Sequence, residues 1–461
     1  MPYLTVMTTR QPVAHIVTLG CARNDTDSEQ LAGQLLADGI GLTDDASQAD
    51  IIVVNTCGFI DAAKKDSIDT ILALDDVRRA RPGVKLVAAG CMAQRYGDEL
   101  AASLPELDAI VGFDGYPMIG DNLRAVLGGR HPSTPPPSAP WTPPRQRLDD
   151  GPYAPLKIAS GCDRRCAFCA IPSFRGSYHS RPQDDIVAEA GWLVGQGVRE
   201  IMLVSENTSS YGKDLDDRRQ ALPRLLRRLS EVDGLEWVRL SYLQPAEMTP
   251  GLLDVMTQTE RILPYFDLSF QHASRLLLRR MRRFGDTESF LSLIGQIRHR
   301  CPSAGIRTNV IMGFPGETDE DVTTLHDFLQ QAGFDAIGVF SYSDEEGTEA
   351  YHLDGHLPDD VIAERTRATS ELVTWLMESR AADRIGEPVT VLVEDVGGVF
   401  TGRSAHQGPE VDGTTRLDWP DDVPPPKAGD LVDARITATD GVDLIAQTRS
   451  YNSSSFSGCN R

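Results

Sequence analysis

Short apolar runs alternate with longer amphipathic stretches along the first 130 residues. The stretches at residues 26–39 and 61–80 have apolar positions at helical spacing. The apolar runs have the continuous character of strands buried on both faces: VAHIVTLG (13–20), DIIVVNT (50–56), KLVAAG (85–90) and AIVGF (109–113). This alternation predicts a small open α/β domain with a parallel sheet.

The alternation resumes after residue 150 and continues for six strand-like runs. These runs are LKIAS (156–160), EIMLVSE (200–206), WVRLSYL (237–243), YFDLSF (265–270), RTNVIMGF (307–314) and AIGVFSY (336–342). Amphipathic stretches of helical character lie between them. Six β/α units predict a partial barrel whose functional site lies at the carboxyl ends of its strands.

From about residue 383 the pattern changes to short strands separated by turn residues, which predicts a small five-stranded antiparallel β-barrel. Residues 131–145 contain seven prolines and indicate an extended linker. We therefore expect five regions: an α/β domain (1–130), a linker (131–147), a β/α partial barrel (148–380), a small β-barrel (381–450) and a disordered tail (451–461).

Three cysteines in the first domain, Cys21, Cys57 and Cys91, each follow an apolar run, where a strand ends and a helix is expected to begin. The carboxyl ends of parallel strands share one edge of a sheet, which is where ligands bind. The sequence therefore predicts that the three thiols converge there. The alternative is that they are three unrelated buried residues.

A second set of three cysteines follows the first strand of the predicted partial barrel. Cys162, Cys166 and Cys169 have the spacing C-x3-C-x2-C. Three thiolates can bind three irons of a 4Fe–4S cluster and leave the fourth iron open to a substrate that accepts an electron. S-adenosylmethionine is such a substrate in radical enzymes. The alternative is a zinc site, for which His179 is an isolated candidate fourth ligand.

Composition narrows the classes of function. The net charge of −22 disfavours a broad phosphate-binding surface, although it leaves room for a local basic groove. An acidic surface suits a basic partner, or serves only solubility. No apolar stretch approaches the length of a membrane span, and the N-terminus lacks the features of an export signal. We therefore expect a cytoplasmic protein.

The segment CDRRCAFC on the first strand of a β/α barrel resembles the radical S-adenosylmethionine superfamily. Three segments of the first domain, TLGCARNDTDSEQ, NTCGFIDAAKKDSI and AAGCMAQRYGDEL, resemble one branch of it, the methylthiotransferases. The C-terminal barrel is similar to the TRAM domain, a substrate-recognition module. The resemblance covers nearly the whole chain.

This resemblance implies two 4Fe–4S clusters and S-adenosylmethionine as cofactors, and an electron donor such as flavodoxin or ferredoxin. It assigns the radical cluster to Cys162, Cys166 and Cys169, and an auxiliary cluster to Cys21, Cys57 and Cys91. The expected S-adenosylmethionine contacts are Phe168, Glu206, Asn207, Gly313, Gly316 and Glu317. It assigns no catalytic residue beyond the cluster ligands.

Within the branch, CAIPSFRGSYHSRP, FQHASRLLLRRMRR, FSYSDEEGTEAY and GRSAHQGPEVDG resemble the RimO type, which methylthiolates an aspartate of ribosomal small-subunit protein twelve. The MiaB type, which modifies isopentenyl-adenosine in tRNA, is the alternative. Residues 383–450 contain thirteen acidic and six basic residues, a net charge of −7. Such a barrel repels tRNA phosphates and attracts a basic ribosomal protein. A non-enzymatic iron–sulfur or zinc-binding module remains a further alternative.

Overall fold

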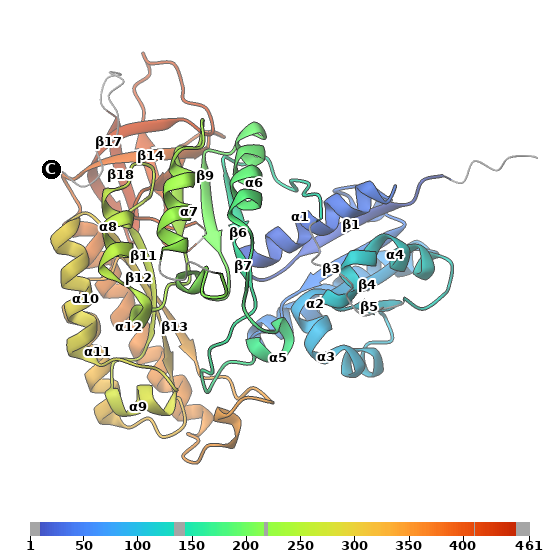
Figure 1. The fold of residues 1–461 in the computed structure, drawn as a ribbon, viewed down its shortest axis with the longest axis horizontal. Coiled ribbons are helices and arrows are strands. Elements are labelled where there is room, and N and C mark those ends of the chain that lie inside the picture. The colour runs from blue at the N-terminus through green and yellow to red at the C-terminus, as the bar shows by residue number, and fades with distance from the viewer. Residues whose placement is uncertain (1–9, 133–142, 216–219, 410, 449–461) are drawn as a thin grey trace, which may run out of the picture. The chain divides into compact units, whose positions relative to one another are not determined.

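The computed structural model describes residues 10–132, 143–215, 220–409 and 411–448 (Figure 1). The chain divides into two compact units, Met1–Asp149 with Ser173–Arg175, and Asp150–Pro172 with Gly176–Arg461. The predicted tail and residues 133–142 of the predicted linker lie outside the described residues. Among the described residues, no helix combines the length and the apolar character needed to cross a membrane.

The first unit contains a parallel sheet with strand order β2-β1-β3-β4-β5. Its strands are β1 (Val13–Thr18), β2 (Gly41–Leu42), β3 (Ile51–Thr56), β4 (Lys85–Ala89) and β5 (Ala109–Val111). Its helices are α1 (Ala22–Ala37), α2 (Asp61–Ala80), α3 (Gly90–Ser103) and α4 (Ile119–Leu127). Every residue of β3 is buried, which explains its continuous apolar run. The predicted open α/β fold is confirmed.

The second unit contains the predicted β/α partial barrel. Its parallel strands are β6 (Tyr153–Lys157), β9 (Glu200–Val204), β10 (Trp237–Leu240), β11 (Tyr265–Gln271), β12 (Gly305–Met312) and β13 (Ala336–Ser341). They form two three-stranded sheets, β10-β9-β6 and β11-β12-β13. Two isolated parallel bridges connect β10 and its loop to β11 and its loop, namely Val238 with Ile262 and Leu243 with Leu268. The order of the strands in space is therefore their order in sequence.

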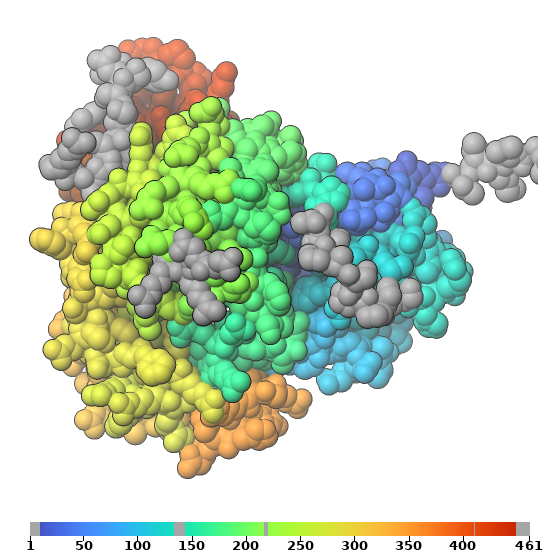
Figure 2. Space-filling model, in the orientation of Figure 1, coloured from blue at the N-terminus to red at the C-terminus, as the bar shows by residue number. Residues whose placement is uncertain are grey.

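Helices close the outside of this barrel over one continuous core. They are α6 (Gln183–Gly195), α7 (Ala221–Ser230), α8 (Pro250–Gln258), α9 (Arg275–Arg280), α10 (Thr287–Arg300), α11 (Asp319–Ala332) and α12 (Asp359–Asp383). The short helix α5 (Ile171–Arg175) belongs largely to the first unit, which includes Ser173–Arg175. In the space-filling view, the face of this unit toward the viewer is formed largely by the green to yellow segments that carry α6 to α10 (Figure 2). A small hairpin of β7 (Ala159–Ser160) and β8 (His179–Ser180) follows β6.

The C-terminal strands form a closed barrel in the order β14-β15-β16-β18-β17. The strands are β14 (Pro388–Asp395), β15 (Phe400–Ser404), β16 (Thr415–Asp418), β17 (Leu431–Asp440) and β18 (Asp443–Thr448). The predicted small barrel is confirmed. Its pairs are antiparallel except that β16 runs parallel to β18, because the chain leaves β16 for β17 before it returns to that edge.

This small barrel packs against the amino ends of the β/α strands. Trp237 and Tyr265, the first residues of β10 and β11, form a buried cluster with Leu392 of β14. Gly305, the first residue of β12, lies so close to His406 that a Cβ there would be 2.7 Å from its Cα. The carboxyl ends of the same strands, with the second cysteine set, are therefore at the opposite end.

Candidate metal centres

The first cysteine triad lies at one edge of the parallel sheet. Cys21 caps the amino end of α1 after β1, Cys57 follows β3 directly, and Cys91 follows β4 at the start of α3. Because β1, β3 and β4 are neighbours, their carboxyl ends bring the three residues together. The charges of Cys21 and Cys91 both raise the pKa of Cys57, which is consistent with their proximity. Gly20, with φ of +103°, approaches Cys57 so closely that a Cβ would lie 3.0 Å from its Sγ.

Two arginines accompany these thiols. Arg23 Nε lies 3.4 Å from the Sγ of Cys21, and Arg175, which belongs to the first unit, places Nη2 3.2 Å from the Sγ of Cys91. Burial raises the pKa of Cys57 to about 11 and also raises the pKa of Cys91. At Cys21 burial acts in the same direction, but the charge and hydrogen bond of Arg23 outweigh it and lower the pKa. The two cations thus favour thiolates at this edge.

Arg175 is held by two buried polar residues and one half-buried aromatic ring of the first unit. Its Nη1 lies 2.9 Å from the carboxylate of Asp27, its Nη2 donates to the amide oxygen of Asn24 at 3.2 Å, and its guanidinium stacks over Phe113. Asp27 and Asn24 lie on α1, which buries polar residues on the side of the thiols. Asp27 and Asn24 were not among the predicted site residues.

The second triad lies in the loop between β7 and α5. Gly161 opens the loop at φ of +82°, and a Cβ there would lie 2.1 Å from the carbonyl oxygen of Ser177, so only glycine fits. The N–H of Cys162 donates to the carbonyl of Gly176 at 3.1 Å. Burial raises the pKa of Cys162. The loop is thus closed at its base, and Cys162, Cys166 and Cys169 follow within it.

Each triad supplies three free cysteine thiols as possible metal ligands. Among the described residues, no three Cys, His, Asp or Glu side chains are placed so that they could hold one metal ion. His179, the isolated candidate for zinc, is exposed, and its Nδ1 lies 2.8 Å from the carbonyl oxygen of Ser177. A 4Fe–4S cluster takes one thiolate per iron, so its ligands stand apart around it. Two triads of soft sulfur donors therefore fit clusters with one open iron each.

Two predicted cofactor contacts follow β9, beside the cysteine loop. The charge of Glu206 acts on Cys162 and raises its pKa, although less than burial does. Asn207 is buried, and its side-chain N–H groups donate to Ser210 at 2.6 Å and to Glu247 at 3.5 Å. Glu206 thus lies near the loop, whereas the Asn207 amide is engaged by neighbouring protein groups.

The segment GFPGET (313–318) follows β12, also at a strand carboxyl end. Phe168 of the cysteine loop packs edge-to-face on Phe314, with ring centroids 6.5 Å apart. Gly313 and Gly316 have φ of +81° and +84°. A Cβ on Gly313 would lie 2.6 Å from Ile362 of α12, so this glycine permits close packing against a helix.

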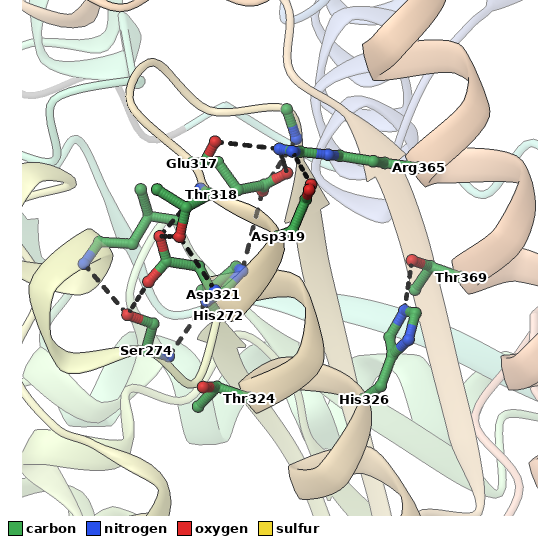
Figure 3. Close-up of polar contacts among 12 residues, drawn as sticks. His272, Ser274, Glu317, Thr318, Asp319, Asp321, Thr324, His326, Arg365 and Thr369 are labelled. Atoms are coloured by element: carbon green, nitrogen blue, oxygen red, sulfur yellow. Dashed lines mark hydrogen bonds and ion pairs between the residues drawn. The ribbon is translucent and has the colours of Figure 1, made fainter.

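Glu317 is fully buried, and both of its carboxylate oxygens have partners (Figure 3). One accepts from the N–H of Gly313 at 2.9 Å and the other from Arg365 of α12 at 2.9 Å. Burial raises the pKa of Glu317, and these two bonds oppose the rise. The Nη2 of Arg365 forms an ion pair with the exposed carboxylate of Asp319. This carboxylate therefore ties the loop to α12.

Three segments of the chain match known families. Residues 13–112 match the Uncharacterized protein family UPF0004, residues 156–329 the Radical SAM superfamily, and residues 385–448 the TRAM domain. Relatives named "Ribosomal protein uS12 methylthiotransferase RimO" are 54% identical in Cutibacterium acnes and 51% identical in Streptomyces coelicolor. The alignments cover 94% of this chain and 97% and 96% of those relatives. The chain belongs to the ribosomal protein uS12 methylthiotransferases.

As a member of this family, the chain is a radical S-adenosylmethionine methylthiotransferase, and its cofactors are S-adenosylmethionine and two 4Fe–4S clusters. The predicted family, enzyme class and cofactors are confirmed. The radical methyltransferase TsrM from Kitasatospora setae has a similar fold, with a TM-score of 0.53 and 15% identity over 72% of this chain and 75% of its own. That likeness concerns the fold alone.

Proposed function

We propose that this chain transfers a methylthio group to the β-carbon of an aspartate in ribosomal protein uS12. The observation that supports this most is the identity of 54%, over nearly the full length of both chains, to relatives that bear the name of this activity. The two cysteine triads at strand ends supply the donor sets that the chemistry needs.

In this proposal, Cys162, Cys166 and Cys169 hold the cluster that binds S-adenosylmethionine, and Cys21, Cys57 and Cys91 hold the auxiliary cluster. When bound, these groups supply one-electron cleavage of S-adenosylmethionine, a radical able to take an unactivated hydrogen, and the sulfur to be inserted. The chain itself holds the thiolates at strand ends, places Glu206 beside the radical-cluster loop, and sets Arg23 beside the auxiliary site.

The C-terminal barrel supports a basic protein as the substrate. Its region carries a net charge of −7, which disfavours tRNA phosphates and attracts lysine- and arginine-rich chains. The barrel packs at the amino ends of the β/α strands, and the cysteine loop lies at their carboxyl ends. A partner that engages both must span strands of up to eight residues, roughly 26 Å at about 3.3 Å per residue.

The electron donor in this proposal is a small redox protein such as flavodoxin or ferredoxin, and the site of action is the cytoplasm. The cytoplasm keeps the six cluster cysteines reduced and contains the ribosomal substrate.

The experiment uses the full chain, reconstituted anaerobically with iron and sulfide. It is incubated with S-adenosylmethionine, dithionite and either purified unmodified uS12 or tRNA that carries isopentenyl-adenosine. The proposal predicts that uS12 gains the mass of one methylthio group on a single aspartate while tRNA stays unchanged. Modification of the tRNA alone would overturn the choice of substrate.

A further inference from the structure

We infer that Glu247 is a positioning residue that fixes the radical-cluster loop through Arg164. This inference rests on the proposed function in one respect, namely that the loop of Cys162, Cys166 and Cys169 holds a cluster. Glu247 ends a short 3-10 helix, Pro245–Glu247, which follows β10 at its carboxyl end.

The carboxylate of Glu247 gathers donors from the two neighbouring segments. Arg164 and Lys213 donate to Oε1 at 2.8 and 2.5 Å, and Ser209 and Ser210 donate to Oε2 at 2.8 and 3.0 Å. Burial alone would raise the pKa of Glu247, but the Lys213 bond and the Arg164 charge outweigh it and lower the pKa to about 2. The group is therefore a permanent anion at neutral pH.

Arg164 lies between the first two cysteines of the loop. The base of the loop is held by the bond from Cys162 to Gly176, and its far part by the bond from the N–H of Ala167 to the carbonyl of Met281, both 3.1 Å long. Arg164 lies between these anchors, and its bond to Glu247 ties this middle part to the segment after β10. Glu247 thus holds the stretch that separates Cys162 from Cys166.

The Glu247 carboxylate also connects the loop to the segment after β9. Ser209 donates to Glu247 and accepts the N–H of Gln244, which joins the segments that follow β9 and β10. The side chain of Glu247 is only 13% exposed, so these bonds are largely shielded from water. A partly buried carboxylate with several charged and neutral donors holds its partners more firmly than an exposed pair does.

Position and charge near a cluster matter because hydrogen bonds, charge and exposure around the thiolates set its affinity and reduction potential. Loss of Glu247 removes a tether and leaves the charge of Arg164 without this counter-ion beside the cysteine loop. Substitution of residues that support metal ligands from outside typically lowers metal affinity or activity 10- to 100-fold.

The test compares Glu247→Gln, Arg164→Met and the double variant with the wild-type chain, each reconstituted anaerobically. Cluster content, the electron paramagnetic resonance spectrum with and without S-adenosylmethionine, and the kcat and KM of its reductive cleavage are measured without any protein or RNA substrate. The matched control is Asp254→Asn on α8, which neutralises a half-exposed carboxylate that pairs with Arg300 of α10, away from the cysteine loop.

The inference predicts that both single variants change the spectrum of the reduced cluster and slow cleavage about tenfold, and that the double variant is no worse than either. Arg164→Met carries the test if Glu247→Gln does not fold. A wild-type spectrum and rate in the single variants, or additive losses in the double variant, would overturn it. A wild-type chain that cleaves S-adenosylmethionine but leaves uS12 unmodified would instead refute only the proposed substrate. A wild-type chain that binds no cluster would refute both.

Discussion

The guanidinium of Arg403, on β15 of the small barrel, lies 2.8 Å from the carboxylate of Glu200, the first residue of β9. Both side chains are buried. Arg239 of β10 lies 2.6 Å from the same carboxylate, and Glu394 of β14 pairs with Arg403 from the other side. This network makes the small barrel a fixed part of the second unit.

Arg403→Met should destabilise the second unit by about 3 kcal/mol, because it removes the partner of Glu394 and leaves the buried Glu200 with Arg239 as its remaining cation. Urea unfolding of the full chain measures the loss. Arg416→Met on β16 is the matched control, because this arginine side chain is 48% exposed and should change stability little. Equal stability of the two variants would show that the buried network does not hold the barrel.

Arg365→Ala should raise the KM and the Kd for S-adenosylmethionine about tenfold, because Glu317 then loses the partner that ties residues 313–318 to α12. Binding and reductive cleavage of S-adenosylmethionine provide the measurement. Asp319→Asn is the control, since it alters the exposed partner of Arg365 and leaves the Glu317 bond intact. If Asp319→Asn has the larger effect, the buried contact is not the one that matters.

Cys57→Ala should leave reductive cleavage of S-adenosylmethionine within about twofold of wild type and abolish methylthio transfer, since it removes a ligand of the auxiliary site only. Cys162→Ala should abolish both, because cleavage depends on the radical cluster. Chromatography of the cleavage products and the mass of the protein substrate distinguish these results. Loss of cleavage in Cys57→Ala would contradict this division between the two triads.

Stability should fall as the pH drops below about 6.5, in part through His272. Burial lowers the pKa of this residue to about 4, from 6.5 in the unfolded chain, so the unfolded state binds more protons between these values. Its stabilising contribution is complete above pH 6.5 and is lost toward pH 4. Between pH 7 and pH 5.5 the loss is about 1 kcal/mol.

Anaerobic urea unfolding of the wild type and of His272→Gln at these two pH values measures this contribution. The variant should lose about 1 kcal/mol less than the wild type between them. The same pH dependence in both chains would mean that His272 gains its proton without cost in the folded state.

The positions of the cysteines could be predicted because each follows a strand, and parallel strands bring their carboxyl ends to one edge. Cys57, for example, comes directly after a run in which every residue is buried. The strand Thr415–Asp418 was harder to recognise. It has four residues, of which two are exposed and charged, and its partner β18 comes later in the chain.

The polar groups around the triads have no comparable pattern in the sequence that would predict their positions. Glu247 is a single carboxylate in a turn, and its partners Ser209 and Arg164 lie 38 and 83 residues away. Glu317 is predicted from the sequence as a contact of S-adenosylmethionine, and its bonds to Gly313 and to Arg365, 48 residues later, carry no sequence signal. Only the folded chain shows which of these groups meet.

The intact mass of uS12 from cells with and without this gene tests most directly whether uS12 is the substrate. Nucleoside analysis of the tRNA from the same cells accompanies it. The proposed function predicts that uS12 loses the mass of one methylthio group when the gene is deleted, while the tRNA nucleosides stay the same. Unchanged uS12 with loss of the methylthio group from isopentenyl-adenosine in tRNA would contradict it.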